Sequence, residues 1–186
     1  MACVQCEDGG VSSPQQSEPP QTVSHTGDPA PDRSPAREVR LERRTSQDPQ
    51  VLALVGRYVA ELDERFPGGF AVAGPDDLVD PGGHYLLATV DGAPAAVGGV
   101  RAVARPEGAA EVKRMWVDPA YRGLGLGRRV LAALEELAVE LGHRTVVLDT
   151  NRTLGEALSL YAAAGYREVE RYNDNPYAEA FFRKEL

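Results

Sequence analysis

Cysteine is nearly absent from this sequence, and long apolar runs are missing altogether. The two cysteines, Cys3 and Cys6, have the spacing Cys-x-x-Cys, but a zinc site needs two more ligands and no strand–helix pattern surrounds the pair. We therefore interpret them as incidental thiols and expect no metal site. No apolar run approaches the roughly 18–20 residues of a membrane span, and the first residues have neither the basic start nor the apolar stretch of a secretory signal. These absences predict a soluble, cytoplasmic protein with no membrane partner.

Positive charge is also scarce over the chain as a whole. The formal net charge is −8 at pH 7, whereas proteins that bind nucleic acids normally present a basic face, so we expect no nucleic-acid partner. The arginines are unevenly spread, however, because Arg114, Arg122, Arg128 and Arg129 gather around one glycine-rich segment. This local concentration of positive charge is compatible with a site for a small anionic ligand.

The 186 residues are enough for one domain of usual size and an extension. Residues 1–37 contain many prolines among serine, glutamine, glycine and acidic residues. Because this composition cannot build a core, we expect a disordered tail there. The domain is expected at residues 38–186, with a boundary between residues 38 and 48. The transitional segment 38–45 can add an edge strand or a helix to it.

Hydrophobic periodicity predicts a helix followed by three antiparallel strands in the first half of the domain. The helix is expected over residues 48–66, where apolar residues recur at helical spacing after Asp48 and Pro49. The dipeptide Asp91-Gly92 is typical of a hairpin turn between the first two strands. The three strands are expected at residues 85–90, 95–103 and 111–117.

The second half alternates helices with strands. An amphipathic helix follows the glycine-rich segment and ends at Gly142, and a second helix, residues 154–164, ends at Gly165. The order of elements is helix, three strands, helix, strand, helix, two strands. It predicts a mixed α/β (α+β) fold in which one central sheet is flanked by helices on both faces. The strands of this half are expected at residues 145–148, 166–172 and 180–184.

The clearest functional signal lies between the third expected strand and the amphipathic helix. Its glycines, Gly123, Gly125 and Gly127, let an anion approach the unpaired N–H groups of the helix N-terminus. A Walker loop is excluded because no Lys-Ser or Lys-Thr pair follows the glycines. A dinucleotide fingerprint is excluded because Arg128 takes the place of its third glycine. The remaining pattern, Arg-x-x-Gly-x-Gly, begins at Arg122.

This pattern resembles the pyrophosphate loop of the GNAT N-acetyltransferase superfamily, which binds acetyl-coenzyme A (acetyl-CoA). Residues 115–123 resemble the strand-to-helix junction of that superfamily. Residues 160–166 resemble its later Leu-Tyr-x-x-x-Gly-Phe motif, with Tyr166 in place of Phe. The resemblance covers residues 48–186 and implies the GNAT fold. It also implies an acyltransferase that moves the acetyl group of acetyl-CoA onto a primary amine of a small molecule by direct attack in a ternary complex.

The resemblance further implies how the coenzyme is held. Backbone N–H groups of the glycine loop bind the pyrophosphate, and Arg122 shapes the loop or meets a phosphate. Arg128, which lies nearer the helix start than Arg129, is favoured to reach phosphate oxygens, and a solvated helix charge is the alternative for either arginine. The preceding strand splays from its neighbour and offers free N–H groups, and a β-bulge explains why Lys113 and Arg114 precede three apolar residues, although burial on both faces explains that triplet as well. Asn151 either bonds near the coenzyme or is an ordinary turn or cap asparagine. The expected coenzyme-binding residues are Trp116, Val117, Arg122, Gly123, Leu124, Gly125, Gly127, Arg128 and Asn151.

Two further residues are expected to carry the proton transfers. Tyr161 resembles the general acid of the superfamily, and a phenol with a pKa near 10 keeps its proton at neutral pH and can donate to a departing thiolate. The alternative interpretation of Tyr161 is a tyrosine that only packs on the sheet. Glu111 lies where superfamily members often place a carboxylate that deprotonates the amine, and a structural salt bridge to Lys113 or an arginine is its alternative. Cys3 and Cys6 lie in the tail, so no cysteine near the site can carry an acyl group.

Other activities stay open from the sequence alone. A GNAT-fold sensor would bind acyl-CoA without turnover, although Tyr161 favours an enzyme because a pure binder needs no acid. An acetyltransferase for protein lysines or N-termini is a third possibility, and a homodimer also stays open. His84 and His143 fall in no motif and are expected to be structural or exposed. The aromatic residues that can line an acceptor pocket, or pack in the core, are Tyr172, Tyr177, Phe181 and Phe182.

Overall fold

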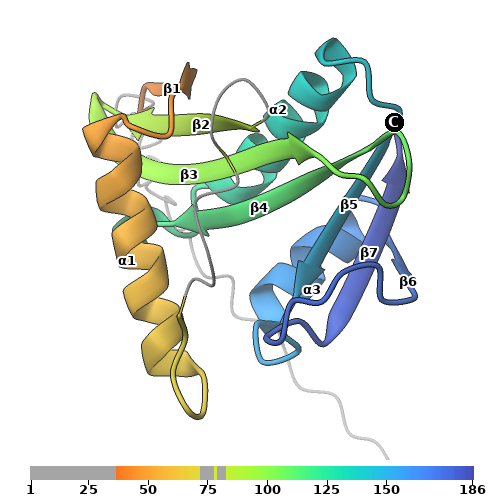
Figure 1. Ribbon diagram of the computed structural model, residues 1–186. Coiled ribbons are helices and arrows are strands. Elements are labelled where there is room, and N and C mark those ends of the chain that lie inside the picture. The colour runs from red at the N-terminus through yellow and green to blue at the C-terminus, as the bar shows by residue number, and fades with distance from the viewer. Residues whose placement is uncertain (1–36, 72–77, 79–82) are drawn as a thin grey trace, which may run out of the picture. The chain divides into compact units, whose positions relative to one another are not determined.

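The computed structural model describes residues 37–71, 78 and 83–186. The expected tail, residues 1–37, lies outside these ranges apart from Arg37, and so do Cys3 and Cys6. From Val39 onward the described residues build one seven-stranded sheet. Helices cover both of its faces, as Figure 1 shows. The predicted mixed α/β fold is therefore confirmed.

The first half of the sheet is an antiparallel meander. The transitional segment forms an edge strand, one of its two sequence-based alternatives. Asp91 and Gly92, with φ angles of 50° and 82°, make the tight hairpin turn that their sequence predicts. The strands are β1 (Val39–Arg44), β2 (Gly83–Val90), β3 (Ala93–Ala102) and β4 (Ala109–Val117).

The second half of the sheet begins with β5 (Thr145–Thr150), which runs parallel to β4. β7 (Ala180–Glu185) lies antiparallel beside β5, and β6 (Arg167–Val169) forms the far edge. The strand order is β1-β2-β3-β4-β5-β7-β6. A parallel pair therefore lies at the middle of an otherwise antiparallel sheet.

The expected strand over residues 166–172 is too long. Only Arg167–Val169 pairs with β7. Farther along, the Asn173 side-chain oxygen accepts from the Asn175 amide and the Asn175 side-chain oxygen accepts from the Tyr177 amide, both at 3.1 Å. Such side-chain turns compete with the hydrogen-bond ladder of a sheet. The chain between β6 and β7 is a loop for this reason.

Local signals set the bounds of the helices. Asp48 caps the first helix, because its carboxylate accepts from the amides of Gln50 at 2.8 Å and Val51 at 3.2 Å. Pro49 occupies the first helical position, where its missing N–H costs nothing. Gly142, with φ of 93°, ends the second helix as predicted. The helices are α1 (Pro49–Arg65), α2 (Leu126–Glu140) and α3 (Gly155–Ala163), and a short 3-10 turn (Pro119–Tyr121) precedes α2.

Two apolar cores hold the helices on the sheet. On one face, Leu54 of α1 packs in a cluster with Leu87 and Trp116 of the strands. On the other face, α2 and α3 share a larger cluster with the sheet. Gly98 of β3 permits the close approach of α2, because a Cβ atom there would lie 2.8 Å from Leu134 Cδ1. None of the helices in the described ranges is both long and apolar enough to cross a membrane.

Candidate active site

The sheet opens where its two halves meet. β4 and β5 pair only from Ala109 to Glu111 of β4, and beyond Glu111 no strand of the described ranges pairs with this edge of β4. Figure 1 shows the two strands diverging from that point. Backbone groups on this edge of β4 therefore lack strand partners and are available to a ligand.

A β-bulge lies in β4 beside the opening. The register between β3 and β4 shifts between Val97 and Gly99, and Arg114 has φ of 53°. The bulge predicted from the break in alternation is thus confirmed. A non-glycine residue in this conformation is uncommon and persists where its surroundings hold it. Here the Arg114 guanidinium donates to the Tyr85 hydroxyl at 2.8 Å.

The glycine-rich loop between β4 and α2 presents a continuous run of free amides. Gly123 and Gly125 have φ angles of 83° and 72°, and open space lies where their Cβ atoms would be. Within the described part of the chain, the amides of residues 123–128 meet no hydrogen-bond acceptor, and no side chain caps α2. N–H groups at the positive end of a helix dipole fit an anion such as pyrophosphate.

Arg122 shapes the start of this loop. Its Nε donates to the Val117 carbonyl at 3.1 Å and its Nη2 donates to Glu61 of α1 at 2.5 Å. The same Glu61 oxygen accepts from the Trp116 indole at 2.8 Å. Burial raises the pKa of Glu61, but the hydrogen bonds from Trp116, Arg122 and Arg65 outweigh it and lower that pKa. Sequence analysis missed Glu61, because nothing in α1 points to a partner so distant in the chain.

The remaining loop residues surround the first turn of α2. Arg128 and Arg129 are exposed, and neither guanidinium pairs with a carboxylate of the described residues. Leu124 is also exposed. Gly127 faces α3, since a Cβ atom there would lie 3.5 Å from Leu160. This turn therefore adds positive charge to the free amides.

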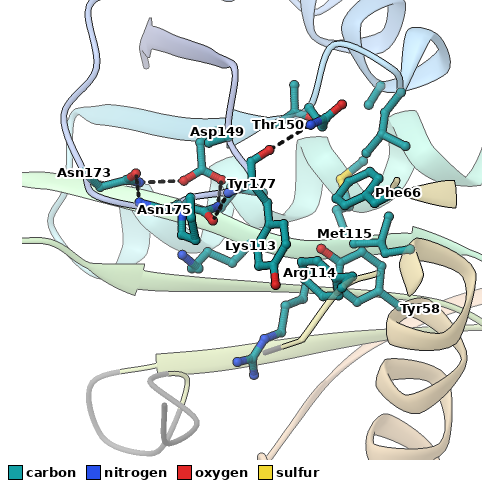
Figure 2. Close-up of a pocket in the computed structure, with 18 of the residues that line it drawn as sticks. Tyr58, Phe66, Lys113, Arg114, Met115, Asp149, Thr150, Asn173, Asn175 and Tyr177 are labelled. Atoms are coloured by element: carbon teal, nitrogen blue, oxygen red, sulfur yellow. Dashed lines mark hydrogen bonds between the residues drawn. The ribbon is translucent and has the colours of Figure 1, made fainter. Parts of the chain in front are cut away.

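A pocket of about 390 Å³ borders the opening. Its size falls within the range of pockets that hold small molecules. Figure 2 shows Asp149, Asn173 and Asn175 at one side of this pocket, and Tyr58 and Phe66 at the other. The lining comes from α1, residues 66–71, β4, β5, α3 and the loop 173–178.

Tyr161 of α3 lines this pocket and is 7% exposed. Its ring packs against Tyr166 and Phe182, with centroids 5.9 and 6.0 Å apart. Burial raises the pKa of Tyr161 well above 10.0, and the nearby Tyr58 and Asp149 raise it further. The phenol therefore keeps its proton at neutral pH. The structure combines both sequence-based expectations for Tyr161, because the residue packs on the sheet and also borders the pocket.

Glu111 is 1% exposed, and its carboxylate is fully engaged. One oxygen accepts from Arg101 at 2.9 and 2.7 Å and lies 3.4 Å from the Lys113 ammonium. The other accepts from Tyr172 at 3.0 Å and Asn173 at 3.1 Å. Burial raises the pKa of Glu111, but the charge of Lys113 and the hydrogen bond from Arg101 outweigh it and hold that pKa below its usual value. The salt bridge that the sequence allowed as an alternative is therefore present, and Glu111 is not among the residues lining the pocket.

Asn151 lines the pocket and also organises the chain after β5. Its side-chain amide donates to the Tyr177 carbonyl at 2.9 Å. Its side-chain oxygen accepts from the Thr153 amide at 2.9 Å and from the Thr153 hydroxyl at 2.7 Å. The turn role that the sequence offered as an alternative is thus present in the structure, whereas no side chain caps α3.

Asp149 is a pocket residue that the sequence analysis missed. Its two carboxylate oxygens accept from the side-chain amides of Asn173 at 2.5 Å and Asn175 at 3.2 Å. A signal was available, since Asp149 directly follows the buried apolar run Val146-Val147-Leu148. No comparable signal marks Asn173 and Asn175, whose sequence context is that of an ordinary turn.

Aromatic rings form the other side of the pocket. Phe70 is central, with ring centroids 4.7 Å from Tyr177, 5.7 Å from Phe66 and 6.2 Å from Tyr58. The Tyr177 hydroxyl accepts from the Ala71 amide at 3.2 Å. Of the aromatic residues expected at an acceptor pocket, Tyr177 lines it, while Phe181 and Phe182 are buried in the core and Tyr172 bonds to Glu111.

Histidines and metal ligands do not contribute to this site in the described ranges. The His143 ring lies 2.9 Å from the Gly108 carbonyl, away from the pocket lining. Among the described residues, no group of three or more histidine, cysteine and acidic side chains is placed to hold a metal ion. The chemistry of the site therefore comes from amides, three tyrosines, carboxylates and basic side chains.

Known proteins are similar to this chain in sequence. Residues 39–166 match the acetyltransferase (GNAT) family. The uncharacterized N-acetyltransferase YjgM of Escherichia coli is 31% identical over 138 residues, which cover 70% of this chain and 83% of the relative. The N-alpha-acetyltransferase RimI of Mycobacterium tuberculosis is 34% identical over 94 residues, which cover 50% of this chain and 58% of the relative.

Solved structures show the same fold. A crystal structure from Klebsiella pneumoniae, assigned as an acyl-CoA N-acyltransferase, superposes with a TM-score of 0.66. The alignment covers 80% of this chain and 97% of that protein, at 25% sequence identity.

Proposed function

Because the chain belongs to the acetyltransferase (GNAT) family of acyltransferase enzymes, we propose that it transfers the acetyl group of acetyl-CoA to a primary amine of a small molecule. Acetyl-CoA supplies this group as an activated thioester. The transfer is a direct attack of the amine within a ternary complex, as no cysteine lies in residues 37–186. The observation that carries the proposal is the divergence of β4 and β5. It brings together a free strand edge, the free amides of the loop and a pocket of about 390 Å³.

The loop residues hold the coenzyme in this proposal. The amides of residues 123–128 bind the pyrophosphate, and Arg128 adds charge at the helix start. Arg122 keeps the loop in shape through Val117 and Glu61. The edge of β4 at Trp116 and Val117 offers backbone groups to the coenzyme arm, and Asn151 fixes the end of β5 on its other side. The residues present therefore fit the coenzyme.

Tyr161 is proposed as the general acid. It lines the pocket, and its raised pKa keeps the phenol protonated, so it can give a proton to the departing thiolate. A carboxylate offers about four lone-pair directions, and Glu111 already accepts four hydrogen bonds and faces Lys113. We therefore propose that Glu111 positions the loop after β6 rather than acting as the base.

A thiol-release assay tests the function. Wild-type protein with acetyl-CoA and a panel of small primary amines should release free thiol only when an amine is present. Mass spectrometry should find the amine heavier by one acetyl group in equal amount. Saturable binding of acetyl-CoA in calorimetry, with no amine acetylated, would instead favour the non-catalytic sensor.

Acetylation of protein N-termini is the second candidate, because the chain is similar to RimI. The pair alaninamide and an alanine-initiated hexapeptide separates the two substrates, since both present the same α-amine. The pocket volume of about 390 Å³ suits a small acceptor and so favours alaninamide. A kcat/KM for the peptide that exceeds that for alaninamide by about tenfold would overturn the small-molecule assignment.

A further inference from the structure

Asp149 differs from the neighbouring Glu111 in its partners. Glu111 is surrounded by Arg101 and Lys113, whereas Asp149 accepts only from the neutral amides of Asn173 and Asn175. Within the described residues, no basic side chain lies at ion-pair distance from Asp149. A half-buried carboxylate without a cation can accept a cationic ligand, because each oxygen retains a free lone pair.

The carboxylate of Asp149 is held in a fixed orientation. Its backbone pairs with Phe181 of β7 within the sheet. The Asn173 amide that bonds it also bonds Glu111 at 3.1 Å, and Asn175 is fixed by its bond from the Tyr177 amide. Figure 2 shows both asparagine side chains turned toward Asp149. Such a network orients the oxygens before any ligand arrives.

The other side of the pocket is suited to an apolar group. Tyr58, Phe66, Phe70 and Tyr177 pack ring against ring there. The pocket thus has a carboxylate at one side and aromatic surface at the other, and Arg101, Lys113 and Arg114 also line it. The negative charge of Asp149 lies close enough to Tyr161 to contribute to the raised pKa of the Tyr161 phenol. The carboxylate therefore belongs to the same site as the expected acid.

We propose that Asp149 binds the ammonium group of the acceptor and takes its proton, and that the acceptor is a primary amine with an apolar body that packs on the aromatic side. This rests on the proposed function. Asp149 is then a catalytic residue, while Asn173 and Asn175 are positioning residues.

The proton and electron transfers balance as follows. One N–H proton of the ammonium group moves to a carboxylate oxygen of Asp149 and leaves a lone pair on nitrogen. The nitrogen forms a bond to the acetyl carbonyl carbon, the carbon–sulfur bond breaks with its electron pair on sulfur, and sulfur takes the proton of Tyr161. The nitrogen loses a second proton, which restores Tyr161, and Asp149 returns its proton to solvent.

Asp149→Asn tests the proposal with 2-phenylethylamine as acceptor. The loss of a charged hydrogen bond should raise the KM for this amine by about 10- to 100-fold and lower kcat, while the KM for acetyl-CoA changes little. Glu107→Gln is the matched control, since Glu107 is exposed, does not line the pocket, and its loss changes the net charge equally. The KM of this control for 2-phenylethylamine should stay within about threefold of wild type. In the wild type, kcat/KM should be about tenfold or more higher for 2-phenylethylamine than for ethanolamine, because only the former buries a ring. Equal values for the two amines, or an unaltered KM in Asp149→Asn, would overturn the proposal.

A binding measurement separates this inference from the proposed function. Calorimetry with saturating coenzyme A should show 2-phenylethylammonium binding the wild type about tenfold more tightly than the neutral 2-phenylethanol. This measurement uses only the wild type, so it tests the proposal even if Asp149→Asn fails to fold. Ammonium binding without turnover of any amine would end the proposed function but support the assignment of Asp149. Equal affinity for the amine and the alcohol, or no binding of either, would overturn that assignment.

Discussion

The two sides of the site are built in different ways. Most of the proposed coenzyme side is one continuous segment, residues 116–128, which presents free backbone amides. The acceptor side is assembled from side chains of α1, residues 66–71, β4, β5 and the loop 173–178. The first depends on a local backbone conformation, and the second depends on the completed fold.

This difference determines whether a substitution can alter coenzyme binding and amine binding independently. A backbone site tolerates new side chains except where a glycine conformation is required. At a site built from side chains, a substitution removes one functional group and leaves the others in place. We therefore expect variants of the loop to alter coenzyme affinity alone, and variants of the pocket to alter the amine parameters alone.

Tyr161→Phe should have the largest effect, because this residue acts where the two sides meet. The variant keeps the ring and its packing on Tyr166 and Phe182 but loses the proton donor. We expect kcat to fall by about 10²- to 10⁴-fold. Steady-state assays measure the fall, and calorimetry should give an unchanged Kd for acetyl-CoA. A kcat within about twofold of wild type, with product release shown not to limit it, would remove the acid role.

Glu111→Gln should have the next largest effect, on stability rather than on coenzyme binding. It leaves the half-buried Arg101 and Lys113 beside a neutral group, which costs about 3 kcal/mol, the lower end of the range for a buried pair. Urea unfolding at pH 7 measures this loss. The low folded pKa means that Glu111 stabilises the protein above the usual value of 4.5, and that this contribution is lost as the pH falls through the folded value.

The stability curves should therefore converge in acid. Wild type should exceed Glu111→Gln most at neutral pH, and the gap should shrink below pH 4.5. A gap that is constant from pH 7 to pH 3 would contradict the charge-based account. Glu107→Gln, on the exposed turn before β4, provides a control with the same chemical change.

The sequence predicts the coenzyme side better than the acceptor side. Gly123, Gly125 and Arg122 lie close together in the chain, so a short pattern shows them. The fold was predictable for the same reason, since each element has its own periodicity and caps, as Asp48 and Gly142 illustrate. The overlong strand at 166–172 shows the limit, because side-chain turns of the asparagines prevailed over strand propensity.

The acceptor side escaped prediction because its contacts join distant segments. Glu61 meets Arg122, and Asn173 meets both Asp149 and Glu111. None of these pairs has a spacing that a helix or strand period reveals. Asp149 alone carried a local signal, as a carboxylate that follows a buried apolar run.

Gly125→Val tests the coenzyme side directly. Its φ of 72° is unfavourable for a side chain with a Cβ branch, at a cost of about 1–2 kcal/mol. The loop must distort to relieve this strain, so the Kd for acetyl-CoA should rise about 5- to 30-fold in calorimetry. Gly142→Val places a similar strain at the other end of α2, where φ is 93°, and should lower stability without changing that Kd. Equal Kd values for Gly125→Val and wild type would refute the loop assignment.

Glu61→Gln should have the smallest effect, but it tests where the two sides are joined. Glu61 lies on α1, which lines the pocket, and it holds Arg122 of the loop. Loss of its charge should weaken coenzyme binding by about 1 kcal/mol, or about fivefold. Glu64→Gln, exposed on the same helix, is the control. If Glu61→Gln and Glu64→Gln bind the coenzyme equally well, Glu61 does not support the loop.

The central claim is that the two sides hold both substrates at the same time. Initial velocities measured over a grid of acetyl-CoA and amine concentrations test it most directly, with 2-phenylethylamine or the best amine of the panel. Direct transfer in a ternary complex predicts double-reciprocal lines that intersect. Parallel lines, together with an acetylated protein trapped in the absence of amine, would indicate a covalent acyl-enzyme and contradict the account.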